Sequence, residues 1–78
     1  MNQQRDIAQQ IEKARAWLRT CRDMRWAAEA RLLAGGEYHE VANKRAELRA
    51  AEGQAEAAFQ DLRDWEDFGR RQAARKYG

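Results

Sequence analysis

Side chains that commonly carry catalysis are scarce in this chain. Of its 78 residues, one is histidine (His39), one is cysteine (Cys21) and none is serine. Enzymes usually need a nucleophile beside a base, or two carboxylates facing each other across a cleft. Cys21 falls on an apolar row of a helical segment, where an inert, buried thiol is expected. The sequence therefore predicts a protein that is not an enzyme and has no catalytic residues.

Metal, phosphate and cofactor sites lack their usual spacing. His39 has Glu37, Glu40 and Asp23 as candidate co-ligands, but these residues do not repeat in the pattern of a structural metal site. Gly35-Gly36 has no Gly-Lys-Ser/Thr ending and no strand before it, so it is a turn rather than a phosphate-binding loop. We predict no metal and no cofactor, with His39 solvated in the first turn of a helix.

A cluster of arginines is the main charged feature. Four of them recur every three or four residues in the first half of the chain: Arg15, Arg19, Arg22 and Arg25. Such a face could contact phosphates or an acidic protein surface. Acidic residues at helical spacing explain most of the cluster as ordinary ion pairs, and the formal net charge is only +2. Nucleic acid bound through Arg15, Arg19 and Arg22 is therefore an alternative and not the leading prediction.

The elements that must position these residues are two helices. The chain has no proline and is rich in Ala, Arg, Glu and Gln, which are good helix formers. Its one strong break, Gly35-Gly36, predicts a helix over about residues 3–34, a turn, and a second helix over about 37–76. We expect an all-α, antiparallel, coiled-coil-like two-helix hairpin that forms a single domain. Gly53 is expected to be tolerated within the second helix, at a close helix contact.

Apolar residues recur along both segments at the spacing of a packed helix face, which we call the seam. Its members are Ile7, Ile11, Trp17 and Leu18 in the first segment, and Val41, Leu48, Ala55, Phe59, Leu62 and Trp65 in the second. Two helices alone cannot bury so wide a face, and one core in a chain this short rarely supplies more than ~3–5 kcal/mol. We therefore expect a homodimer in which two hairpins form a four-helix bundle.

The register of the hairpin is expected to follow from a symmetric fold about Gly35-Gly36. This fold places Ile7 near Asp64. The second helix then exceeds the first by about two turns, which have no partner within the hairpin. Phe68 and Tyr77 lie near or in this free end, which is expected to meet a second copy or another protein.

A second apolar row lies off the seam and next to the turn. Trp26, Ala30 and Leu33 fall on one helix face, Arg22 can stack on Trp26 four residues later, and Tyr38 lies across the turn. Tryptophan and arginine are enriched among the residues that dominate binding energy at interfaces. We predict that these five residues bind another protein.

These features predict a small protein–protein interaction module, a homodimeric hairpin that inhibits or modulates another protein. The architecture resembles that of compact all-helical inhibitors and adaptors encoded by phages and mobile elements, although no sequence motif carries the likeness. Two alternatives stay open: a nucleic-acid-associated regulator, and a structural or chaperone hairpin whose free helix end caps a partner helix. A single cysteine and the lack of any long apolar run predict a reducing cytoplasm and no membrane contact.

Overall fold

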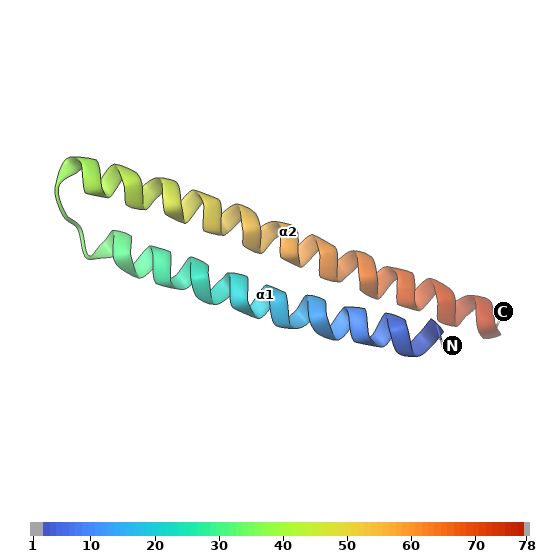
Figure 1. Cartoon of the computed structure of the whole chain (residues 1–78). Helices are drawn as coiled ribbons and strands as arrows, with labels where there is room; N and C mark the ends of the chain where they lie inside the picture. Colours follow the sequence, from blue (N-terminus) through green and yellow to red (C-terminus); the bar gives the residue numbers. More distant parts are fainter. Residues whose placement is uncertain (1–2, 78) are drawn as a thin grey trace.

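Two antiparallel helices lie side by side along their length in the computed structural model (Figure 1). The structure describes the backbone of residues 3–77 and the side chains of residues 6–75. Helix α1 spans Gln3–Leu33 and helix α2 spans Tyr38–Tyr77. They form a rod of 60 × 16 × 15 Å. The prediction of an all-α two-helix hairpin is confirmed.

The turn between the helices occupies residues 34–37 and depends on its two glycines. Gly35 has φ +79° and Gly36 has φ +135°, both in the region that side chains with a Cβ atom rarely adopt. The Gly35 N–H donates to the Leu32 carbonyl at 3.1 Å, which closes the last turn of α1. On the other side, the Val41 N–H donates to the Glu37 carbonyl at 2.9 Å and opens α2.

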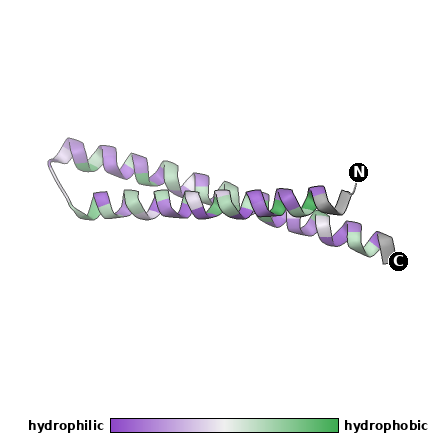
Figure 2. Cartoon of the chain, turned by 60° about the horizontal axis from the view of Figure 1, so that its bottom comes forward, coloured by the Kyte–Doolittle hydropathy of each residue, from purple (hydrophilic) through white to green (hydrophobic). Residues whose placement is uncertain are grey.

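The hydrophobic core is a narrow strip between the helices. In Figure 2, hydrophobic and hydrophilic segments interleave along both helices, as amphipathic helices require. The buried residues are Ile7, Ala14, Leu18, Cys21, Ala28, Ala51, Ala55, Ala58 and Leu62. Most of them are alanines, which let the helices approach closely but remove little apolar area from water. The hairpin therefore has a small core.

The predicted seam residues divide into three groups by burial. Ile7, Leu18, Ala55 and Leu62 are buried, whereas Ile11, Val41, Leu48 and Trp65 are partly buried. Trp17 and Phe59 are exposed, at 51% and 39% of their surfaces. Each helix has only one neighbour, so only the central positions of the seam are covered. Trp17 and Phe59 therefore lie outside the core of the hairpin.

The register differs from the symmetric fold predicted from the glycine pair. A Cβ atom on Gly69 would lie 3.2 Å from Ile7 Cγ2, so Ile7 faces Gly69 and not Asp64. Arg31 Nε lies 3.6 Å from Glu47 Oε2, which also places the partner farther along α2 than predicted. The shift exceeds one helical turn.

A hydrogen bond from Lys44 stabilises this shifted register. The Lys44 Nζ donates a 2.6 Å hydrogen bond to the Gly35 carbonyl just beyond the end of α1. The C-terminal end of α1 thus lies beside the second turn of α2, where a cation is favourable because the helix dipole is negative.

The predicted free end of two turns is absent in this register. Ile7 and Ala8 of α1 line one groove together with Gln72 and Ala73 of α2, so α1 covers α2 at least to Ala73. Only the end of α2 projects past α1 (Figure 1). Phe68 lies within the paired region, and the side chain of Tyr77 lies outside the described residues.

Gly53 does not break α2, and it is not at a close contact. The helix continues through it, and an added Cβ atom would meet nothing within 4 Å. The close approach occurs instead at Gly69, beside Ile7 and Ile11. The expectation of a tight helix contact at Gly53 was wrong because Gly53 lies on the outer face of α2, between the buried Ala51 and Ala55.

Replacing Lys44 with methionine is expected to lower the free energy of unfolding by about 1 kcal/mol. Methionine keeps the aliphatic length of the side chain but removes the donor to Gly35. Urea denaturation followed by circular dichroism measures the effect. The control is Arg45→Met at the exposed neighbouring position. Equal midpoints for the two variants would contradict the role of Lys44.

Candidate interaction surfaces

Two ion pairs mark the two sides of the hairpin. Residues spaced by seven share one side of a coiled-coil helix, so each pair identifies a row on α1 and a row on α2. The Arg31–Glu47 pair joins the rows that we call the Trp17 flank, namely Trp17, Met24 and Arg31 with Glu47, Gln54, Asp61 and Phe68. The Arg15–Glu66 pair, 3.4 Å long, joins the rows of the Arg15 flank, namely Arg15, Arg22 and Glu29 with Glu52, Phe59 and Glu66.

The Arg15 flank is densely charged with both signs. Arg22 and Arg25 line a surface hollow together with Glu52 and Glu56. Arg15 is paired with Glu66, and this pair faces solvent. The arginines that could have formed a phosphate-binding face thus lie among carboxylates from α2, which the register brings beside them.

A single aromatic side chain interrupts this charged flank. Phe59 lies in the same seven-residue row as Glu52 and Glu66, with the Arg63 guanidinium 5.8 Å from its ring centroid. The cation–π contact thus forms here, and not between Arg22 and Trp26 as predicted. The seven-residue spacing from Glu52 to Glu66 is the sequence signal that could have placed Phe59 on the side opposite Trp17.

The Trp17 flank is apolar or uncharged over its middle third. Trp17 is 51% exposed and Met24 is 39% exposed. The neighbouring positions on this side are also uncharged. They are the exposed Thr20 and the half-buried Ala27 on α1, and the exposed Ala50, Gln54 and Ala57 on α2. Farther from the turn, Trp65 and Phe68 pack edge to face with ring centroids 6.0 Å apart. This side is therefore the more hydrophobic of the two.

The predicted partner-binding residues all lie on the surface. Trp26 is 74% exposed and Leu33 is 81% exposed, and Arg22, Ala30 and Tyr38 are exposed as well. Trp26 and Leu33 are seven residues apart, so they share an outer row of α1 that adjoins the Arg15 flank. Tyr38 lines a separate hollow made of α2 residues. The structure thus brings together the α1 members of this set and leaves Tyr38 apart.

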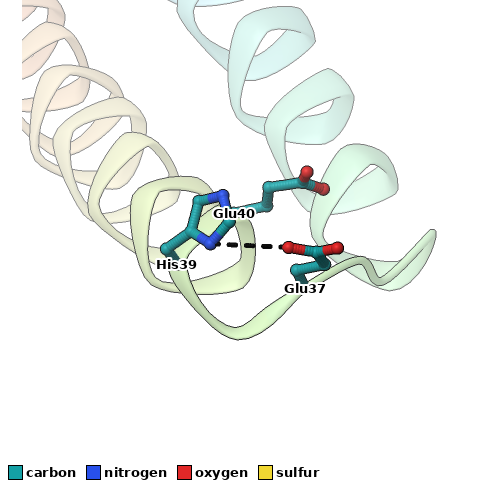
Figure 3. Close-up of side chains that lie close together, drawn as sticks. All are labelled: Glu37, His39 and Glu40. Carbon is teal, nitrogen blue, oxygen red and sulfur yellow. Dashed lines mark ion pairs between the residues drawn. The ribbon is translucent and has the colours of Figure 1, made fainter.

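His39 lies in a small exposed cluster at the start of α2. The ligand atoms of Glu37, His39 and Glu40 are within 4.8 Å of one another, and His39 Nδ1 is 3.8 Å from Glu37 Oε2 (Figure 3). Acidic side chains at this position are stabilised by the positive end of the helix dipole. That effect accounts for both carboxylates, and all three side chains remain open to water. Asp23, the other candidate ligand, is not part of the cluster.

Cys21 has no accessible surface and lies among Ala14, Leu18, Ala55 and Ala58. A thiol that apolar side chains shield from water is expected to be inert. It belongs to the core.

Comparison with protein-family models, curated proteins and solved structures found no match to this chain. The fold defines the protein as a two-helix hairpin with one densely charged flank and one flank that is uncharged over its middle third. Over residues 3–77, neither helix contains a stretch that is both long enough and apolar enough to cross a membrane.

Proposed function

We propose that the protein is a homodimeric, non-enzymatic interaction module that binds another protein in the cytoplasm and inhibits or modulates it. The observation that carries this proposal is the exposure of Trp26 and Leu33 on one outer row of α1. Large apolar side chains that pack in neither the core nor a pocket of their own chain are typical of binding surfaces. Arg22 lies one turn from Trp26, and this pairing of residue types is common at interface hot spots.

The arrangement of the arginines supports a protein partner over nucleic acid. Arg15 pairs with Glu66, and Arg22 and Arg25 share their hollow with two glutamates. Phosphate contacts would have to compete with these carboxylates, and the low net charge provides little long-range attraction. The alternative of a hairpin that caps a partner helix rested on a free end of two turns, which this register removes.

The homodimer is supported by the large surface of the single chain. A compact monomer of 9.1 kDa exposes about 4,900 Å², whereas this hairpin exposes 6421 Å². The excess of about 1,500 Å² is larger than the ~800 Å² that each partner contributes to a standard interface. A dimer would bring the exposed fraction close to that of an ordinary globular protein.

Replacing Trp26 with alanine is expected to weaken partner binding at least tenfold without changing stability by more than about 0.5 kcal/mol, because the side chain is exposed. Immobilised wild-type protein would be incubated with cell extract, and the captured proteins identified by mass spectrometry. A candidate partner would then be purified and its affinity measured for both proteins.

The matched control is Phe59→Ala, which removes an exposed aromatic side chain on the other helix. It should retain binding. Capture of no specific protein by the wild type, or equal affinity of the Trp26→Ala variant, would count against the proposed binding surface.

A further inference from the structure

We infer that the Trp17 flank binds a second copy of this chain whose turn lies at the same end, so that α1 of each copy packs on α2 of the other. The inference rests on the homodimer of the proposed function and adds its face and orientation. The two flanks of the hairpin differ in composition, and only one of them suits a buried interface.

The charged flank is poorly suited to self-association. Packing it against a second copy would remove Arg22, Glu52 and Glu66 from water, along with their charged neighbours, and burial of ion pairs costs free energy unless the geometry is excellent. On the Trp17 flank, the positions that face this side are uncharged from Trp17 to Ala27 on α1 and from Ala50 to Ala57 on α2. Its burial removes mainly apolar area from water.

The shape of the Trp17 flank also favours a partner helix. Trp17 and Met24 stand two turns apart on α1, whereas the middle of α2 presents Ala50 and Ala57. In the orientation with both turns at one end, a two-fold axis runs parallel to the helices. Met24 then lies level with the second copy's Gln54, between its Ala50 and Ala57, and Trp17 lies one turn beyond Ala57, level with Asp61. Large side chains opposite small ones allow close helix packing.

Charges at the two ends of the uncharged stretch select the orientation. The Arg31–Glu47 pair shows that these two residues lie at one height along the rod. When both turns lie at the same end, Arg31 therefore also faces the second copy's Glu47, and Lys13 lies within about one turn of the second copy's Asp64. Opposite charges meet at both ends.

The reverse orientation brings like charges together. With the turns at opposite ends and the uncharged stretches still superposed, α2 faces α2, and Asp61 lies near the second copy's Glu47. In that arrangement Arg31 faces Trp17 and has no carboxylate opposite it. Repulsion of this kind disfavours the alternative pairing.

The first test compares two substitutions at equally exposed positions. Met24 and Phe59 are each 39% exposed, but they lie on opposite flanks. Light scattering on the wild type should give the mass of a dimer. Met24→Glu should raise the dimer dissociation constant roughly 30-fold or more, because it buries an unpaired charge. Phe59→Glu should leave the dissociation constant within about threefold of the wild-type value. Circular dichroism would verify that both variants remain helical.

The second test measures orientation. Glu37→Cys in a Cys21→Ala background places one spin label at each turn of the dimer. Dipolar distance measurements should give a separation well under half of the 60 Å length of the rod. A separation close to the full length would overturn the same-end orientation, and so would a dimer that resists Met24→Glu.

These outcomes are separable from failure of the proposed function. A monomeric wild type would remove both the homodimer and this inference, but capture of a partner through Trp26 would be unaffected. A dimer that survives Met24→Glu and dissociates with Phe59→Glu would keep the homodimer and move its interface to the Arg15 flank.

Discussion

The Leu18→Ala variant is expected to be largely unfolded at 25 °C. Leu18 is buried at the centre of the core, in one cluster with Cys21, Ala58 and Leu62. Truncating a buried leucine to alanine costs about 2–5 kcal/mol, which is comparable to the ~3–5 kcal/mol of net stability that a core in a chain this short provides. Urea denaturation followed by far-ultraviolet circular dichroism measures this loss, at one fixed protein concentration because dimerisation raises apparent stability.

Leu33→Ala provides the matched control in the same helix. Leu33 is 81% exposed, so the same substitution should change the free energy of unfolding by less than about 0.5 kcal/mol. If Leu18→Ala and Leu33→Ala had equal midpoints, Leu18 would not be a core residue, and the face that α1 turns toward α2 would have to be reassigned.

Gly36→Ala and Gly53→Ala are expected to have opposite effects on stability. Gly36 has φ +135°, a backbone conformation in which a Cβ atom is strained, so the substitution should cost about 1–3 kcal/mol. Gly53 lies within α2 where an added Cβ atom meets open space, so alanine there should add about 1 kcal/mol through helix propensity. The two variants carry the same chemical change and should differ by roughly 3 kcal/mol.

Thermal and urea denaturation of both variants test this pair. The difference between them is independent of the exact stability of the wild type. A stabilised Gly36→Ala variant would show that the turn can adopt another conformation. A destabilised Gly53→Ala variant would show that the outer face of α2 near residue 53 is covered, most simply by a second copy of the chain.

The helices and the turn could be predicted from the sequence because they depend on local information. A chain rich in helix formers, without proline and with one glycine pair, has few alternatives to a hairpin. The central core positions also followed from spacing, since Leu18, Ala55 and Leu62 remain on the inner face in any register that pairs the two seams.

The register could not be predicted because it depends on tertiary contacts near the turn. The hydrogen bond from Lys44 to Gly35 stabilises a register in which α2 is displaced by more than one helical turn relative to a symmetric fold. A shift of about a heptad returns similar residues to the seam, so hydrophobic spacing alone does not distinguish the registers. The same ambiguity led to the predicted free end of α2.

The candidate surfaces were predicted only in part. Trp26 and Leu33 were expected outside the seam, and they are exposed. Trp17 and Phe59 were assigned to one common seam, although they lie on opposite flanks. The flank on which each residue lies depends on which face its helix turns toward the other helix. Assigning that flank requires the antiparallel pairing as well as the spacing within each helix.

The complete burial of Cys21 makes the thiol a reporter of opening motions. As the only cysteine in the chain, it reacts with a thiol reagent only when the helices separate around it. When closing is faster than the reaction, the ratio of the native to the unfolded labelling rate equals the equilibrium population of the open state. Labelling as a function of protein concentration would then measure how strongly association protects the middle of the rod, under native conditions and without a denaturant.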